Sequence, residues 1–207
     1  MHRFRLSRIL LCGLVSLFFV TSFAATQNSD AAAQVLPAPY QKWLDEDVRY
    51  LITDQERDEF ETLKSDQQRD KFVEQFWDRR NPNPGSSENP FKEEHYRRLA
   101  YVNEQFAARV PGYKTDRGRV YIVYGPPDER EVYPADTSPN LPPDASPTRR
   151  HRNEVWRYNF IQGLGRNIVF DFVDKCDCGE YQLNHDPTKR RLRQSQNKEK
   201  MVPSSRL

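Results

Sequence analysis

Residues 111–128 read PGYKTDRGRVYIVYGPPD, and the pattern of apolar residues changes at this stretch. Before it, apolar side chains recur at helical spacing, whereas after it they alternate as they do along strands. Within it, residues 119–124 form a short run of mostly β-branched or aromatic residues, with apolar side chains on both faces. Such a run predicts a buried strand. Helices followed by strands predict an α+β domain, with N-terminal helices packed on a small C-terminal antiparallel β-meander.

Four helices are predicted upstream of this stretch, within residues 40–108. A short first helix over 40–51 carries apolar side chains at helical spacing. The other three begin at capping signatures, which are Thr53 with Glu56, Ser65 with Gln68, and Asn89 followed by Pro90.

The region downstream predicts a loop and then a hairpin. Residues 126–152 contain seven prolines, a density that predicts a long loop outside any sheet. Residues 155–160 and 168–172 alternate in hydrophobicity around a glycine-rich turn, which predicts two antiparallel strands. Residues 180–183 fit a last short strand.

The N-terminal residues have the parts of a secretory signal peptide. Three arginines lie within the first eight residues, an uncharged apolar run covers 9–23, and small residues precede a cleavage point at Ala24. A retained anchor helix is the alternative, but it needs about 20 apolar residues. We therefore expect an exported protein, periplasmic or secreted, with no membrane span after cleavage. The expected organisation is a signal peptide over 1–24, a linker over 25–39, the domain over 40–186 with its proline-rich loop at 126–152, and a basic, disordered tail over 187–207.

The distribution of charge excludes one class of partner. The formal net charge of the whole chain is +2, but part of the positive charge lies in the predicted signal peptide and more of it in the C-terminal tail. The body between them is acidic, which argues against a nucleic-acid-binding domain, because such a domain needs a basic face. The tail is either simply solvated or a contact for an anionic partner.

Two cysteines, Cys176 and Cys178, follow the predicted cleavage site in a C-x-C arrangement. An even number of cysteines in an exported protein suggests a disulfide. Neighbours this close form only a small ring, so a bridge between them would be readily reduced, and two free thiols are the alternative. No CxxC pair or histidine cluster accompanies them, so we expect no metal site and no cofactor.

Residues 112–118 gather the polar side chains that could carry chemistry. Thr115, Asp116 and Gly118 are residues that commonly shape turns, which favours a structural role. In a functional role, Arg117 and Lys114 would hold an anionic group where the chain leaves the core.

His95 is the candidate acid or base, because it lies on the apolar stripe of a predicted helix. Approach of Asp116 or Asp128 would make it one member of an acid/base pair. A buried neutral histidine with a single hydrogen-bond partner is the alternative. Gly125 and the residues that follow it, Pro126 and Pro127, form a rigid turn and no phosphate loop, since proline offers no backbone N–H group.

The ordered set of motifs resembles the GWxTD-domain family of exported bacterial proteins. The stretches that carry the likeness are WL at 43–44, FWxRRNP at 76–82, EEHYRR at 93–98, TDRGRVYI at 115–122, YGPP at 124–127 and EVWxY at 154–158. Tyr113 stands where the family has its namesake tryptophan. The likeness extends over residues 40–184 and implies an exported domain of unassigned function, without an established catalytic residue.

The candidate binding segment therefore consists of the motif itself. Its members are Gly112, Tyr113, Lys114, Thr115, Asp116, Arg117, Gly118, Tyr124, Gly125, Pro126, Pro127 and Asp128. Two functions remain open. The first is a non-catalytic domain that binds a protein or another component of the cell envelope. The second is a hydrolase or an anion-handling enzyme that uses His95, Asp116 and Arg117, and it requires these three side chains to converge in a cleft.

Overall fold

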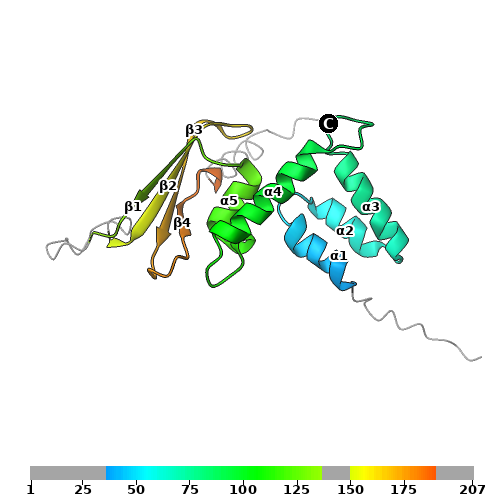
Figure 1. The fold of residues 1–207 in the computed structure, drawn as a ribbon, viewed down its shortest axis with the longest axis horizontal. Helices are drawn as coiled ribbons and strands as arrows, with labels where there is room; N and C mark the ends of the chain where they lie inside the picture. The colour runs from blue at the N-terminus through cyan, green and yellow to red at the C-terminus, as the bar shows by residue number, and fades with distance from the viewer. Residues whose placement is uncertain (1–35, 137–149, 190–207) are drawn as a thin grey trace, which may run out of the picture. The chain divides into compact units, whose positions relative to one another are not determined.

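The computed structural model describes residues 36–136 and 150–189 (Figure 1). The predicted signal peptide, most of the predicted linker and tail, and the middle of the proline-rich loop lie outside these residues. The helical elements are α1 (Ala38–Lys42), the π-helical turn η1 (Trp43–Asp47), α2 (Asp54–Thr62), α3 (Asp66–Asp78), α4 (Pro90–Gln105), the 3-10 turn η2 (Gly112–Lys114) and α5 (Asp116–Tyr124).

The predicted capping signatures begin helices α2, α3 and α4. Thr53 Oγ1 accepts a hydrogen bond from the Glu56 amide at 3.2 Å, and the Glu56 side chain accepts one from the Thr53 amide at 3.1 Å. Ser65 and Gln68 form the same reciprocal pair at the start of α3. The Asn89 side chain accepts from the amide of Lys92 at the start of α4. These bonds satisfy backbone donors that have no partner within the helix.

Glu56 also ties α2 to the end of α3. Arg80 donates to both of its carboxylate oxygens, at 3.0 and 2.7 Å, and Arg79 donates to one of them at 3.0 Å. Burial opposes the ionisation of Glu56, but the hydrogen bonds from Arg80 and from the Thr53 amide outweigh it and lower the pKa of Glu56 to about 2. The arginines at the end of α3 therefore hold the two helices together.

The C-terminal half is a four-stranded antiparallel sheet in the order β1-β2-β3-β4. Its strands are β1 (Glu129–Tyr133), β2 (Arg152–Ile161), β3 (Gly165–Asp174) and β4 (Gln182–His185). Strands β2 and β3 form the predicted hairpin, and β4 is the predicted last strand, shifted by two residues. The α+β class and its helix-then-sheet order are confirmed.

The prediction of a buried strand over 119–124 is wrong, because these residues lie in helix α5. Thr115 caps this helix, and Gly125, with a φ of +84°, ends it. Val120 and Ile122 are both buried, so the helix shows no polar face that would have marked its period. A short apolar run does not distinguish a buried helix from a buried strand, and here the cap decides.

The proline-rich segment was also predicted wrongly in part. Residues 129–133 form β1, which pairs with β2 from Glu129↔Arg157 to Tyr133↔Asn153. The prolines flank this strand and leave its backbone donors intact, and β1 lies at an edge of the sheet, where irregular neighbours are tolerated. Residue 36 is likewise part of the domain and not of a linker, since Leu36 packs against the helical core.

Two apolar clusters hold the domain together. One joins α1, η1, α2 and α3 around Phe60 and Phe76, and both of these rings are fully buried. The other joins α4 and α5 to the sheet around Trp156 and Phe172. Tyr96 on α4 packs against both clusters, so α4 links the helical half to the sheet. None of the helices among the described residues is long and apolar enough to cross a membrane.

Candidate functional site

Thr115 organises the motif by capping α5. Its Oγ1 accepts a hydrogen bond from the Gly118 amide at 3.0 Å and donates one to the Gly112 carbonyl at 2.7 Å. The side chain is buried, so both bonds are shielded from water. Thr115 therefore fixes the turn η2 against the first turn of α5, so it caps a helix where the sequence predicted a residue that shapes a turn before a strand.

Two glycines are required here because backbones approach closely. A Cβ atom on Gly112 would lie 1.8 Å from the carbonyl oxygen of Val102 in α4. A Cβ atom on Gly118 would lie 1.9 Å from the carbonyl oxygen of Gly112. Gly118 lies inside a regular helix, so the reason for this glycine is space and not the unusual backbone shape that the sequence suggested.

Tyr113, at the position of the family's tryptophan, is an internal anchor. Its amide donates to Asn103 Oδ1 at 3.0 Å, and its carbonyl accepts from the Tyr50 hydroxyl at 2.9 Å. The ring is buried in the cluster that joins α4 and α5 to the sheet. The ammonium group of Lys114 lies 5.5 Å from the centre of this ring, so it covers the motif from outside.

Arg117 forms a buried ion pair with Glu154. Its Nη1 lies 3.0 Å from Oε2 of Glu154 on β2, and only 1 % of the Glu154 side chain is exposed. Its Nη2 donates to the Gly179 carbonyl at 3.1 Å, and its guanidinium lies 4.0 Å from the centre of the Tyr181 ring. Arg130 on β1 pairs with the other oxygen of Glu154. The motif arginine thus joins α5 to the sheet and does not face solvent.

Asp116 and Asp128 also bind the backbone of the sheet. Asp116 Oδ2 accepts from the Leu183 amide at 2.8 Å and so attaches β4 to α5. Asp128 Oδ2 accepts from the Asn159 amide at 2.6 Å on β2. Each of these carboxylates therefore performs a structural task at the place where the sequence offered it as an acid or base.

The end of the motif is a packed turn. Tyr124 stacks on Phe170 with ring centres 5.6 Å apart. The Tyr158 hydroxyl donates to the Gly125 carbonyl at 2.9 Å. A Cβ on Gly125 would lie 3.0 Å from the Arg98 guanidinium, so this arginine also covers the turn. Pro126 and Pro127 then lead from α5 to β1, as a rigid connection between the two.

His95 is a buried histidine in the helical half, with 4 % of its surface exposed. Its Nε2 lies 2.5 Å from the backbone carbonyl oxygen of Asp47, and because a carbonyl only accepts, Nε2 is the donor. Burial lowers the pKa of His95, against the hydrogen bond to Asp47, which raises it. The ring borders a small cavity of about 70 Å³.

The three side chains proposed for an enzyme do not join in one site. Among residues 36–136 and 150–189, no hydrogen bond or ion pair connects His95, Asp116 and Arg117. Each binds a different part of the fold, namely η1, β4 and β2. The requirement that they converge in a cleft is not met.

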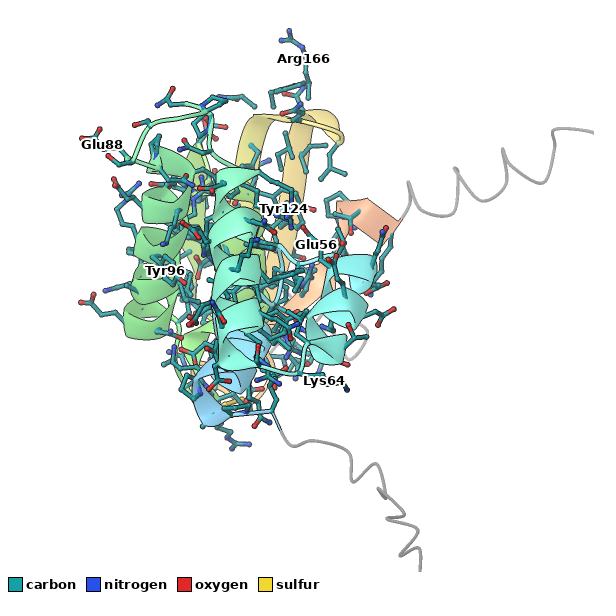
Figure 2. The ribbon with its side chains drawn as sticks, turned by 90° about the vertical axis from the view of Figure 1, so that its right-hand side faces the viewer. Glu56, Lys64, Glu88, Tyr96, Tyr124 and Arg166 are labelled. Carbon is teal, nitrogen blue, oxygen red and sulfur yellow. A yellow bond between two sulfur atoms is a disulfide. The ribbon has the colours of Figure 1, made fainter. Side chains whose placement is uncertain are left out.

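A groove between α3 and α4 has a volume of about 1160 Å³. Figure 2 shows these two helices side by side, with Tyr96 on α4 and Glu88 in the loop that connects them. Val73, Trp77 and Tyr96 supply the apolar part of its wall. The loop from residue 81 to 89 closes one end, and the Asn89 side chain holds it by donating to the Trp77 carbonyl at 2.8 Å.

The groove is acidic. Its lining includes four carboxylates and a single lysine, which are Asp70, Glu74, Asp78, Glu93 and Lys92. Asp70 accepts a hydrogen bond from the Tyr40 hydroxyl at 2.7 Å. The side chains of the other three acids make no hydrogen bond or ion pair within the described part of the chain. The ammonium group of Lys92 lies 5.8 Å from the centre of the Trp77 ring, so a cation already sits at this wall.

The model of the GWxTD domain matches residues 26–138, which is more than half of the chain. The chain belongs to the GWxTD-domain family. No curated protein and no solved structure matches it. The matched residues include all the helices and β1, whereas β2, β3 and β4 lie beyond them, so the likeness seen in the sequence over 40–184 is shown for its N-terminal part.

The sequence of this GWxTD domain contained a signal for the groove that was missed. Asp70, Glu74 and Asp78 follow one another at intervals of four residues, and such residues lie on one face of a helix. The spacing places these acids on one face of α3, but it does not reveal which helix packs beside that face, so the groove could not be predicted from it.

Cys176 and Cys178 form a disulfide, with Cα atoms 5.1 Å apart. Together with Asp174 they are the one group of three metal-ligating side chains found in the described residues. The disulfide removes both thiolates, and Asp174 is engaged with Arg152 and the backbone of the turn. The arrangement therefore suits sulfur chemistry better than a metal ion.

Proposed function

We propose that this protein is an exported, non-catalytic GWxTD domain that binds a partner protein of the cell envelope. The proposal rests on a difference between the motif and the groove, namely whether their charged side chains have partners within the fold. Arg117 and Asp116 of the motif are paired inside the fold, whereas Glu74, Asp78 and Glu93 line an open groove without internal partners among the described residues. A surface of this kind is available for binding, and the motif is not.

The occupant of the groove is a polypeptide segment that carries lysine or arginine beside an apolar residue. The carboxylates match its cations, and Val73, Trp77 and Tyr96 match its apolar part. The aromatic wall would hold a guanidinium or ammonium group in the manner in which Trp77 now meets Lys92. Each exposed ion pair contributes only about 0.2–1 kcal/mol, so several together, on top of apolar contact, are needed for useful affinity.

The test places a photo-crosslinking amino acid at Ser86 in the groove, or at Gln55 on α2 as a control, in the full chain in its native envelope. We expect an adduct from Ser86 only, whose mapped partner peptide contains lysine or arginine. Neutralising the groove by Glu74→Gln, Asp78→Asn and Glu93→Gln together should remove the adduct. The matched control changes three exposed carboxylates elsewhere, by Asp58→Asn, Glu59→Gln and Glu104→Gln, and should retain it.

Three results would contradict this proposal. Equal adducts from both crosslinker positions would show that the groove is not selective. A partner peptide without basic residues would refute the charge argument. An adduct with residues 190–207 of the same chain would make the basic tail the occupant in place of a partner.

Export is part of the same proposal. It is supported by the arginines and the apolar run of residues 1–24, and by the disulfide, since disulfides persist mainly in oxidising compartments. The intact mass of the protein recovered from the envelope should correspond to a chain that begins at Ala25. A chain that retains residues 1–24 and remains in the cytoplasmic fraction would contradict export.

A further inference from the structure

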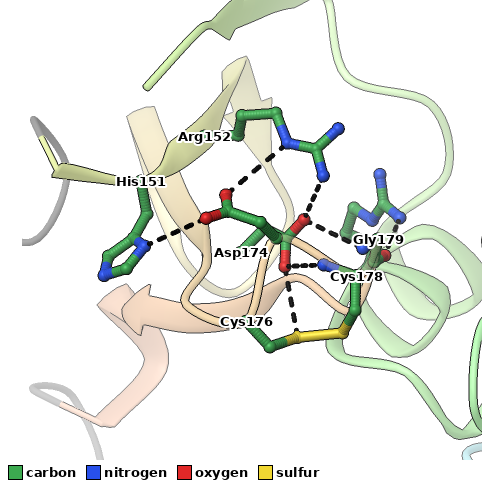
Figure 3. The surroundings of a disulfide bond; sticks show 8 residues. His151, Arg152, Asp174, Cys176, Cys178 and Gly179 are labelled. Carbon is green, nitrogen blue, oxygen red and sulfur yellow. Dashed lines mark hydrogen bonds and ion pairs between the residues drawn. A yellow bond between two sulfur atoms is a disulfide. The ribbon is translucent and has the colours of Figure 1, made fainter. Parts of the chain in front are cut away.

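We infer that Cys176 and Cys178 form a reversible thiol–disulfide site that exchanges electrons with dithiols, and that Asp174 handles the proton of Cys176. Figure 3 shows the parts of the site, which lie in the turn that follows β3. The inference stands on this turn alone and does not depend on the groove between α3 and α4.

The first observation is that the disulfide does little for the fold. It joins two residues separated by one, within a single turn. A disulfide stabilises a protein chiefly by closing a loop in the unfolded chain, and the effect grows with the length of that loop. A loop of three residues is near the lower limit of this effect, so a purely structural purpose does not account for the bond.

The second observation is that the turn is held by other bonds. Asp174 Oδ1 accepts from the Cys178 amide at 3.1 Å, and its Oδ2 accepts from the Gly179 amide at 2.9 Å. Arg152 on β2 donates to Oδ2 at 3.0 Å. None of these bonds involves sulfur. The turn therefore keeps its shape when the disulfide opens, which a reversible site requires.

The third observation is the position of the two sulfur atoms. Cys176 is exposed and Cys178 is half-buried, so an incoming thiolate reaches the Cys176 sulfur directly. That sulfur lies 3.4 Å from Oδ1 of Asp174, and Asp174 is fully buried. In the disulfide the sulfur has no hydrogen to donate. In the dithiol its S–H group can donate to this carboxylate.

The chemistry balances with a dithiol as the reductant. Its thiolate attacks Cys176 Sγ, the bond between the two cysteines breaks, and Cys178 leaves as a thiolate that takes a proton from water. The second thiol of the reductant then passes its proton to Asp174, attacks the mixed disulfide and leaves as a cyclic disulfide. Cys176 departs as a thiolate and recovers that proton from Asp174. Two electrons and two protons move from the dithiol to the protein, and the same steps in reverse oxidise it.

Charges of both signs border the turn: the Asp174 carboxylate beside Cys176 opposes thiolate formation there and accepts the proton of the thiol instead, whereas the nearby cations favour a thiolate. Arg152 lies beside Asp174, and Lys175 directly precedes Cys176. Arg117 donates to the carbonyl of Gly179 at the far end of the turn. Positive charge near a cysteine stabilises its thiolate, which is both the attacking and the leaving form in exchange.

The test measures reduction of the full chain by dithiothreitol under native conditions, with the free thiols counted by alkylation and mass spectrometry. We expect complete and reversible reduction at millimolar dithiol, with an unchanged circular dichroism spectrum. Asp174→Asn should slow the exchange at least tenfold. Asp177→Asn is the matched control, because Asp177 lies in the same turn and meets Arg152 and His151 but not sulfur, and it should change the rate less than twofold.

Several results would overturn the inference. They are a disulfide that resists millimolar dithiol in the folded protein, a reduced form that unfolds, or an Asp174→Asn variant that exchanges at the rate of the unaltered chain. If Asp174→Asn does not fold, the first two measurements on the unaltered chain still test the reversible disulfide, and Asp174→Glu, which keeps the carboxylate, should exchange faster than Asp174→Ala; equal rates for these two variants would contradict the role of Asp174.

Discussion

Replacement of Arg117 by methionine tests whether the motif builds the fold or binds a ligand. Methionine keeps much of the length of the arginine side chain and removes its charge. The change removes the ion pair with Glu154 at 3.0 Å, the hydrogen bond to the Gly179 carbonyl at 3.1 Å and the contact with the Tyr181 ring at 4.0 Å. All three contacts are internal, so the structural account predicts a loss of stability.

The magnitude follows from the surroundings of Glu154. Removing one partner of a buried ion pair typically costs about 3–5 kcal/mol, because the other charge is left without compensation. Glu154 keeps Arg130 and the indole N–H of Trp156, so the cost belongs near the lower end, at about 3 kcal/mol. The double variant Arg117→Met with Glu154→Gln leaves no uncompensated carboxylate, and we expect it to recover about 1 kcal/mol of that loss.

Urea unfolding followed by circular dichroism measures this effect. With a slope of about 2 kcal/mol per molar urea, a loss of about 3 kcal/mol lowers the midpoint by roughly 1.5 M. An Arg117→Met variant that unfolds at the midpoint of the unaltered protein would refute the structural account. If the same variant also lost the crosslinked partner, Arg117 would have to be a binding residue.

Three further predictions concern single contacts. Gly112→Ala should lower the free energy of unfolding, measured by thermal melting, by more than about 3 kcal/mol, because its Cβ would lie 1.8 Å from the Val102 carbonyl oxygen. Gly85→Ala is the control: Gly85 has a φ of +84° but open space around it, so this change should cost only about 1–2 kcal/mol. Asp116→Ala should cost about 1–3 kcal/mol through loss of the bond to the Leu183 amide, and an unchanged melting temperature would contradict this. Glu56 has a folded-state pKa of about 2 against a usual 4.5, so its ionised carboxylate stabilises the fold fully above pH 4.5. This contribution, about 3 kcal/mol at most, is lost as the pH falls toward 2. In Glu56→Gln the free energy of unfolding should therefore fall less steeply between pH 4.5 and 2.

The parts of the fold that depend on local interactions could be predicted from the sequence. Thr53 and Ser65 begin helices because each reaches an amide only three residues ahead. Residues 119–124 could not be assigned in the same way. Their apolar pattern fits a buried helix and a buried strand equally, and the deciding cap at Thr115 was read as part of a turn.

Contacts between distant residues could not be predicted from spacing. Arg117 and Glu154 are 37 positions apart, and their pairing follows only once α5 is packed on the sheet. Strand β1 was hidden for a related reason, because a count of prolines does not show that five consecutive residues between them are free to pair. The acidic groove likewise exists only because α4 lies beside α3, so its carboxylates were not singled out from the sequence.

The motif and the disulfide turn are joined through a short chain of bonds. Arg117 donates to the carbonyl of Gly179, and the amide of the same residue donates to Asp174, which faces the sulfur of Cys176. If opening the disulfide weakens either bond, the stability that Arg117 contributes must differ between the oxidised and the reduced protein. Thermodynamic linkage then requires that loss of Arg117 shift the thiol–disulfide equilibrium by the same free energy. A motif arginine that is structural in its own contacts can in this way shift the thiol–disulfide equilibrium of a turn that it meets only at Gly179.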